Sequence, residues 1–469
     1  MKNIKIVNSV KKIKNIESYL NVTLLSEKKI SKIISKAKMI VGSIEKFTII
    51  GNEMYVNTKS IKDKDDRRTL GYQIGKELLK RKIKNVLINI NIKDDELIQG
   101  LQLGVKISDK YKSEKQKNTL KKVILLNKDR ESLRVAWNKN VNVVESQTLT
   151  QELIDLTGED GTSEILVNMI KKALVDSDIS INVYNEDFLK EQKMNGHLAV
   201  NRASKHQATV VKLTYTPKFP NLYTKDLVFI GKGLTYDTGG LSLKPTNSMI
   251  NMQADKSGAM TLVGLMKYIM RQGSKNKITC YISLAENSLG SESYRPGDVL
   301  TMKNGKTVMV KNTDAEGRLV LFDSLCLAQE QAKEENRKID KIYSIATLTG
   351  AAVGQFGEEA AGLVGFNDKM KKELIKCGNK QGEIFLDAQF HKYMLDGVKD
   401  SIADLSNTGT PYMGCAKAGL FLTNAIDEIN KNKFLHIDIA GPAYTTSGFG
   451  SYKSGASGFG VRSLIKLCS

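Results

Sequence analysis

Two glycine-rich loops and the segment between them gather charged side chains that could hold divalent cations. These side chains are Lys232, Asp237, Lys244, Asp255, Asp314, Glu316 and Arg318. Four carboxylates in loops at strand ends would repel one another strongly unless cations neutralised them. Oxygen-rich sites suit hard or borderline divalent ions such as Mn²⁺, Mg²⁺ or Zn²⁺, and two ions about 3.5 Å apart would form a two-metal hydrolase centre. A glycine-rich loop with an aspartate also occurs as an ordinary turn, so the spacing alone leaves that alternative open.

Histidine and cysteine offer no competing metal site. The four histidines form no HxH or HExxH pattern, and the five cysteines lie far apart without a CxxC pair. Neither a thiolate zinc site nor a disulfide framework is therefore indicated. We expect reduced and mostly buried cysteines, because a free thiol behaves as a small apolar side chain.

The segments that must position these loops alternate between strands and helices. Strands are predicted at 226–230, 278–287, 341–350 and 434–441. Helices are predicted at 258–271, 319–337 and 416–429. Strands separated by helices imply a mostly parallel sheet, and chemistry collects at the carboxyl ends of its strands.

The first 140 residues predict a separate, small α/β domain. Helices are expected at 27–39, 67–81 and 94–105, and strands at 47–56, 84–92 and 122–126. A helix at 147–157 that runs into turn-rich sequence places a boundary between 140 and 165. We therefore predict a two-domain α/β protein, with a basic amino-terminal domain at 1–145, a connecting helix or linker at 146–165, and a larger catalytic domain at 166–469, whose mostly parallel sheet is flanked by helices.

The composition is that of a globular chain. Of its 469 residues, 41% are hydrophobic and 26% are charged, which excludes disordered and fibrous classes. No apolar run approaches the ~18 residues of a membrane span, and the basic start lacks the apolar stretch of a signal peptide. We expect a cytoplasmic protein that has no membrane partner.

The basic excess belongs almost wholly to the first third of the chain. Residues 1–140 hold 33 Lys and Arg against 15 Asp and Glu, a net charge of +18, whereas the whole chain carries +20. Such a domain could bind nucleic acid through phosphate contacts. The alternative is a lysine-rich solvated surface, because the basic residues are scattered and no aromatic residues interleave with them.

Several motifs together resemble the leucine aminopeptidase family, the cytosolic two-metal exopeptidases with the signature NTDAEGR. The two loops read GKGLTYDTGGLSLKP and VKNTDAEGRLVLFD. Further matches are AENSLG…YRPGDVL (285–300), ATLTGA (346–351), NTG (407–409), HIDIAGPA (436–443) and GASGFGVR (455–462). The similarity covers residues 200–469 and extends weakly into the first domain at 96–113.

The resemblance implies a homohexamer of two-domain subunits that hydrolyses the amino-terminal peptide bond of peptides. One of two divalent ions, Mn²⁺ or Zn²⁺, would be held by Lys232, Asp237, Asp255 and Glu316. The other ion would be held by Asp237, Asp314 and Glu316. A hydroxide bridging the two metals would attack the first carbonyl, and one metal would bind the free α-amine.

The resemblance also implies two catalytic residues and an apolar pocket. Lys244 would polarise the carbonyl oxygen, and Arg318 would hold a bicarbonate ion as proton shuttle. The alternative for Arg318 is a salt bridge to a neighbouring carboxylate. The pocket positions, which imply a preference for Leu- or Met-like residues, are Met252, Thr347, Leu348 and Gly350.

The chain departs from the family pattern at Lys256, which adds a cation directly after Asp255. This cation would lower metal affinity unless its side chain points away. Two other functions stay open. One is a narrower dipeptidase such as a cysteinylglycinase, and the other is an added DNA-binding role of the basic amino-terminal domain.

Overall fold

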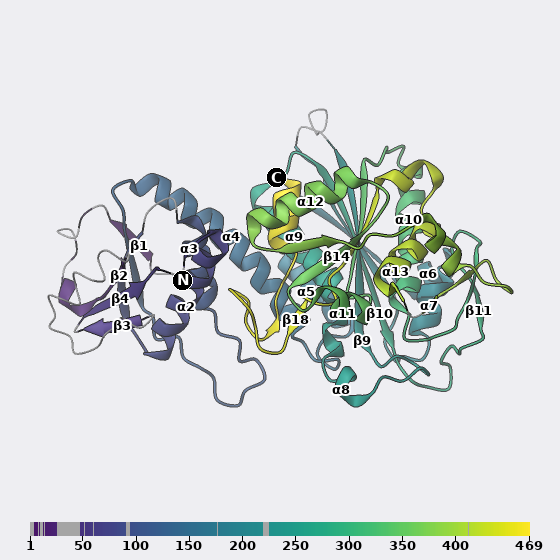
Figure 1. The fold of residues 1–469 in the computed structure, drawn as a ribbon, viewed down its shortest axis with the longest axis horizontal. Coiled ribbons are helices and arrows are strands. Elements are labelled where there is room, and N and C mark those ends of the chain that lie inside the picture. The colour runs from purple at the N-terminus through teal and green to yellow at the C-terminus, as the bar shows by residue number, and fades with distance from the viewer. Residues whose placement is uncertain are drawn as a thin grey trace. The chain divides into compact units, whose positions relative to one another are not determined.

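The computed structural model describes residues 4–7, 9, 13, 15–25, 47–50, 52–59, 61–90, 94–175, 177–218, 225–410 and 412–469. The chain forms two compact units, residues 1–145 and residues 146–469 (Figure 1). Each unit has its own sheet and its own apolar core. No helix within the described ranges is long and apolar enough to cross a membrane.

The first unit is built on a six-stranded sheet with the strand order β1-β6-β5-β2-β4-β3. Its strands are β1 (Ile4–Val7), β2 (Leu20–Leu25), β3 (Phe47–Ile50), β4 (Glu53–Asn57), β5 (Asn85–Asn89) and β6 (Lys122–Leu126). All neighbouring strands are parallel except β3 and β4, which form an antiparallel hairpin. The helices among the described residues of this unit are α2 (Lys64–Lys80), α3 (Asp95–Gly104) and α4 (Arg130–Ile154), and residues 146–154 of α4 belong to the second unit.

The second unit contains an eight-stranded sheet with the order β15-β14-β17-β13-β9-β10-β8-β7. Its strands are β7 (Ile179–Tyr184), β8 (Thr209–Tyr215), β9 (Asp226–Asp237), β10 (Lys277–Asn287), β13 (Lys341–Ala346), β14 (Ala360–Val364), β15 (Ile384–Asp387) and β17 (Phe434–Asp438). The four central strands β17, β13, β9 and β10 are mutually parallel. Their carboxyl ends therefore meet at one edge of the sheet.

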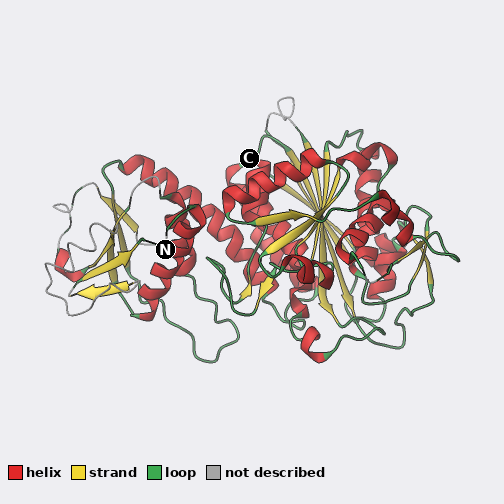
Figure 2. Ribbon diagram, viewed as in Figure 1, coloured by secondary structure: helices red, strands yellow, loops and turns green. Residues whose placement is uncertain are grey.

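Helices cover both faces of this sheet (Figure 2). The helices of the unit are α5 (Ser163–Ala173), α6 (Glu186–Glu191), α7 (Asn195–Asn201), α8 (Thr246–Met249), α9 (Ser257–Gln272), α10 (Gly317–Glu334), α11 (Gly350–Phe356), α12 (Asp368–Gln381), α13 (Gly414–Leu422) and α14 (Val461–Cys468). Small additional strands are β11 (Val299–Thr301), β12 (Thr307–Met309), β16 (Leu405–Ser406), β18 (Tyr444–Thr445) and β19 (Gly455–Ala456). The fold is therefore α/β, and the sheet of the larger unit is mostly parallel, as the sequence predicts.

Several predicted elements have different bounds in the structure. The strand predicted at 226–230 extends to Asp237, so Lys232 and Asp237 lie in β9 and not in the loop after it. Position 231 of this strand is a glycine because α9 packs closely against it. A Cβ there would lie 2.5 Å from the Cα of Ala259. The predicted strand 47–56 is the hairpin β3–β4, and the helix predicted at 416–429 ends at Leu422. The helix predicted at 27–39 lies outside the described residues.

The cysteines agree with the sequence expectation. All five are free, four of them are buried, and Cys377 is half-buried. Burial raises the pKa of each of the five thiols above its usual value. They are therefore protonated side chains that contribute to packing.

Gly258 allows α9 to lie directly against β13. A Cβ at this position would lie 2.1 Å from the backbone oxygen of Ile345, and a backbone atom cannot rotate away. We expect Gly258→Ala to lower the free energy of unfolding by about 1–3 kcal/mol through overpacking. Urea titration would measure this loss. Gly354→Ala in α11 is the matched control, because its Cβ would meet no atom within 4 Å, and an equal loss in both variants would contradict the explanation.

We expect His197 to make the second unit sensitive to acid. Its Nε2 donates a hydrogen bond to the backbone oxygen of Leu284 (2.8 Å), and burial lowers its pKa from 6.5 to about 4. Because the unfolded chain binds this proton first, stability falls as the pH drops below about 6.5. We expect wild-type protein to lose about 2 kcal/mol more unfolding free energy between pH 7 and pH 5 than His197→Gln. Urea titrations at both pH values test this, with exposed His391→Gln as control; equal acid sensitivity of wild type and His197→Gln would refute it.

Candidate metal centre

The carboxyl ends of the four central strands present a group of polar residues. β9 ends at Asp237, β10 at Asn287 and β17 at Asp438, and Thr347 follows β13 directly. Because these strands are parallel neighbours, the four positions share one edge of the sheet. The candidate site lies at this edge.

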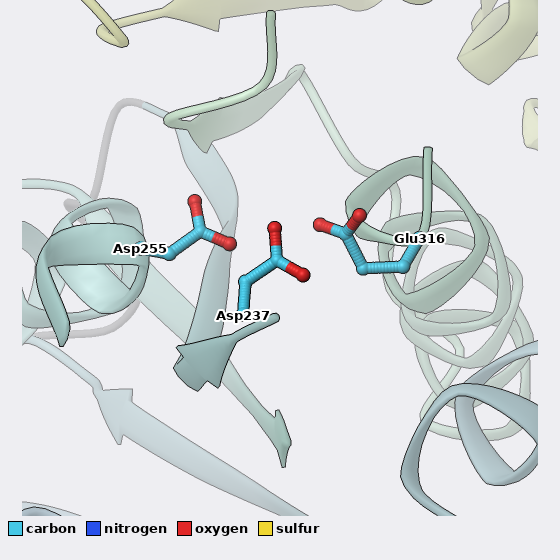
Figure 3. A group of neighbouring side chains, drawn as sticks. All are labelled: Asp237, Asp255 and Glu316. Carbon is cyan, nitrogen blue, oxygen red and sulfur yellow. The ribbon is translucent and has the colours of Figure 1, made fainter. Parts of the chain in front are cut away.

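Three carboxylates from different elements converge there. Asp237 comes from the end of β9, Asp255 from the 3₁₀ helix η4 (Met252–Lys256), and Glu316 directly precedes α10. One oxygen of each lies within 4.8 Å of the others, and all three side chains are buried (Figure 3). This group, the acidic cluster, contains three of the five metal ligands proposed from sequence.

Lys232 neutralises part of the acidic cluster. Its Nζ lies 2.8 Å from Asp255 Oδ2 and 2.9 Å from Glu316 Oε1, and it donates to the backbone oxygen of Thr347 (2.9 Å). Burial opposes the charge of Lys232, but the surrounding carboxylates hold its pKa above the usual value. Lys232 is therefore an ammonium in this arrangement.

Lys244 lies on the other side of Asp237. Its Nζ is 2.9 Å from Asp237 Oδ2 and also forms an ion pair with Asp314. The side chain of Asp314 is 30% exposed, and it is not a member of the buried acidic cluster. Lys244 thus joins Asp314 to Asp237 of the acidic cluster, and burial together with the charge of Glu316 raises the pKa of Asp314.

The pKa of each carboxylate in the acidic cluster depends on its burial and on the charges of its neighbours. Burial raises the pKa of Asp237 to about 8, and the charges of Glu316 and Asp255 act in the same direction. Burial also raises the pKa of Asp255 to about 6, against the effect of the Lys232 ammonium. Burial acts in the same direction on Glu316, but Lys232 and Lys244 lower the pKa of Glu316 below its usual value. A divalent cation would favour the ionised form of all three.

The donor set fits a hard or borderline divalent ion. The acidic cluster offers carboxylate oxygens, which such ions prefer. Glu316 Oε2 is buried and has no hydrogen-bond partner within the described ranges. A buried acceptor of this kind is costly unless a cation or a donor satisfies it.

Arg318 projects from the first turn of α10. Its Nη1 donates to the backbone oxygen of Asn407 (2.7 Å), and among the described residues Arg318 forms no salt bridge of the kind considered from sequence. Its Nε is buried and has no hydrogen-bond partner in the described part of the chain. Burial lowers the pKa of Arg318 to about 10, so the side chain remains a cation at neutral pH.

The residues predicted to line the first side-chain pocket lie in two segments. Met252 is half-buried in η4, the turn that also carries Asp255. Thr347 Oγ1 donates to Asp255 Oδ1 (2.7 Å), and half-buried Leu348 follows it and packs against the core. Gly350 is exposed, and a Cβ there would meet no atom within 4 Å. The structure thus places Thr347 directly against the acidic cluster.

Lys256 points away from Asp255. Its Nζ donates to the backbone oxygens of Leu156 (2.9 Å) and Gln253 (2.5 Å), and the side chain is fully buried. Burial lowers the pKa of Lys256 to about 7. The lysine therefore joins η4 to the segment that precedes α5.

Four supporting residues were not identified from sequence. Asn287 Nδ2 donates to Asp237 Oδ1 (2.7 Å) and to the backbone oxygen of Thr313 (3.0 Å). Asp438 accepts hydrogen bonds from Leu348 N (3.1 Å) and from the Thr349 hydroxyl (2.8 Å). The four residues are Asn287, Thr313, Asn407 and Asp438. The sequence could have indicated them, because each ends a strand or lies within a motif that matches the family.

Comparisons with known proteins agree on one family. Residues 148–465 match the family model described as cytosol aminopeptidase family, catalytic domain. The probable cytosol aminopeptidase of Helicobacter hepaticus (strain ATCC 51449 / 3B1) is 38% identical over 411 residues, which cover 86% of this chain and 85% of that protein. The probable cytosol aminopeptidase of Campylobacter jejuni subsp. jejuni serotype O:2 is 36% identical over 431 residues, 88% of this chain and 86% of that protein.

A solved structure shows the same fold. The bottromycin maturation enzyme BotP, in complex with Mn, superposes with a TM-score of 0.84 at 24% sequence identity. The superposition covers 96% of this chain and 98% of that chain. The fold of this chain therefore has a known counterpart.

Proposed function

Because this chain belongs to the cytosol aminopeptidase family and is a metal-dependent aminopeptidase, a hydrolase, we propose that it releases Leu- or Met-like residues from the amino termini of peptides. The observation that carries this proposal is the acidic cluster at the carboxyl ends of the central strands. Its members come from three separate elements, and each is buried. Packing alone does not require three buried carboxylates to converge, whereas a functional site commonly does.

We assign the metal ligands as the sequence motifs suggest. Lys232, Asp237, Asp255 and Glu316 would hold one divalent ion, Mn²⁺ or Zn²⁺, and Asp237, Asp314 and Glu316 would hold a second. When bound, the two ions supply Lewis acids and lower the pKa of a water molecule. Lys232 would have to lose its proton to join them, because an ammonium has no lone pair to offer.

Lys244 and Arg318 are the proposed catalytic residues. The Lys244 ammonium, already held beside Asp237 and Asp314, would stabilise the negative charge that develops on the carbonyl oxygen. Arg318 would hold a bicarbonate ion as proton shuttle. The unpartnered Nε of Arg318 supports this assignment, because a planar guanidinium binds an oxyanion with paired donors.

The substrate preference rests on the segments around η4 and the end of β13. Met252 and Leu348 supply apolar surface, and exposed Gly350 leaves space beside them. A pocket of this kind discriminates one methylene by about 1–3 kcal/mol. We therefore propose a preference for medium-sized apolar residues and not an absolute specificity.

The decisive assay uses protein stripped by a chelator. We expect hydrolysis of leucinamide and Leu-Gly to return only after Mn²⁺ or Zn²⁺ is added, and N-acetyl-leucinamide to remain intact. No activity with any ion would contradict the proposal. Turnover of Cys-Gly far above Leu-Gly would identify the narrower dipeptidase instead.

The remaining proposals concern location, assembly and the basic first unit. We propose a cytoplasmic homohexamer, which sedimentation analysis would test. The +18 charge of residues 1–140 is the basis for proposing an added role in binding DNA, against the alternative of a lysine-rich solvated surface. Phosphate contacts lose affinity steeply with salt, so a mobility shift that fades with rising salt is expected, and no shift at low salt would refute this role.

A further inference from the structure

The first unit contains a cavity of about 730 Å³ that the catalytic proposal does not use. It lies among the end of α3, the loop after α3, the start of β6 and one face of α4. Its volume is within the range of about 300–1,000 Å³ that is typical of small-molecule sites. Every residue that lines it lies between 102 and 145, whereas the acidic cluster belongs to the second unit. We call it the amino-terminal cavity.

The walls of the amino-terminal cavity combine apolar and polar side chains. Val123, Trp137 and Val144 contribute buried side chains from β6 and α4, and Val105 closes the end of α3. Trp137 is the only tryptophan of the chain. A ligand with an apolar body would therefore remove this surface from water and lie against an aromatic ring.

Gln102 adds an unsatisfied polar group to this wall. The side chain is 4% exposed, and its Nε2 donates to the backbone oxygen of Trp137 (3.4 Å). Its Oε1 is buried and has no hydrogen-bond partner within the described residues. Such an acceptor costs about 1–3 kcal/mol when it is left unpaired. The cavity therefore favours a ligand that brings a hydrogen-bond donor.

Two lysines and one half-buried carboxylate, Glu145, give the amino-terminal cavity charges of both signs, which suits a zwitterion. Lys106 and Lys121 both line it, and both are exposed to solvent. Their ammonium groups can reorient toward a bound anion, because each lies on a long, flexible side chain. We therefore expect the anionic group of a small apolar ligand to be a carboxylate.

We propose that the amino-terminal cavity binds a small apolar zwitterion, namely a free apolar amino acid or a dipeptide. The ammonium of the ligand donates to Gln102 Oε1, the carboxylate pairs with Lys106 and Lys121, and the apolar side chain packs among the valines and Trp137. This assignment does not rest on the catalytic proposal. It concerns a different unit and different residues.

Trp137 supplies a direct reporter for the test. The full chain is titrated with L-leucine while tryptophan fluorescence is recorded, and a saturable change is expected. Two analogues each lack one charge: 4-methylpentanoate has no ammonium, and isoamylamine has no carboxylate. Each is expected to bind at least about 10-fold more weakly than leucine.

Variants test the individual contacts. Gln102→Leu and the double variant Lys106→Ala/Lys121→Ala are each expected to weaken leucine binding at least about 10-fold. Lys117→Ala is the matched control, because Lys117 is an exposed lysine of the same loop that does not line the cavity. Circular dichroism and unchanged hydrolysis of Leu-Gly would show that these variants are folded.

Three results would overturn the proposal: no saturable fluorescence change with leucine, equal binding of either analogue, or full binding in both cavity variants. The catalytic proposal can fail independently. In that case leucine would still bind, while metal-loaded protein would not hydrolyse leucyl peptides.

Discussion

Replacing Asp255 with asparagine is expected to lower kcat/KM for leucyl peptides by about 10³-fold, or ~4 kcal/mol of transition-state stabilisation. Asparagine has nearly the same shape but no charge. The variant would therefore leave Lys232 with Glu316 as its remaining close carboxylate in the acidic cluster, and it would take one anionic oxygen donor from the proposed metal site. The loss of the anionic donor weakens the binding of a divalent cation.

The measurement combines steady-state kinetics with the metal content of dialysed protein. We expect Asp255→Asn to retain less metal than wild type while its circular dichroism spectrum is unchanged. Asp187→Asn is the matched control, because the Asp187 side chain is 87% exposed on α6. Full turnover by Asp255→Asn would show that the ligand assignment is wrong.

Replacing Lys244 with methionine is expected to lower kcat by about 10²–10³-fold with little change in KM, the range found when one oxyanion donor is removed. Methionine keeps much of the side-chain volume but removes the ammonium that lies between Asp237 and Asp314. Because that ammonium competes with a metal for both carboxylates, the variant should bind at least as much metal as wild type. Loss of turnover without loss of metal separates this residue from the ligands.

Metal content and kinetics measured on the same preparation test this separation. Lys205→Met is the control, since Lys205 is an exposed lysine of the same unit. A Lys244→Met enzyme that turns over at the wild-type rate would remove Lys244 from the mechanism. One that loses its metal would instead assign the lysine to maintenance of the site.

The sequence predicted the candidate site best where polar residues directly follow a predicted strand. The strand at 122–126 has the observed bounds, and Asp237, Asp255 and Glu316 converge as the motifs suggested. Local sequence did not show that β9 continues through Gly231 and Gly233, because the reason for these glycines is the close approach of α9 to the first and of β10 to the second. Glycine favours turns when read alone, but here it provides space for a neighbouring element.

The supporting contacts were also beyond reach from sequence. Asn287 binds both Asp237 and the backbone of Thr313, and Arg318 binds the backbone of Asn407, 89 positions away. Such contacts depend on which strands are neighbours. The sequence also could not show where the Lys256 side chain points. In the structure its Nζ donates to two backbone oxygens.

The state of the sulfur atoms matters for anyone who wishes to attach a probe to this protein. Maleimides and iodoacetamides react with thiolates, and here four thiols are buried, Cys377 is half-buried, and all have raised pKa values. The native background of labelling is therefore low. A single cysteine introduced on an exposed loop can carry a dye or spin label without first removing the five that are present.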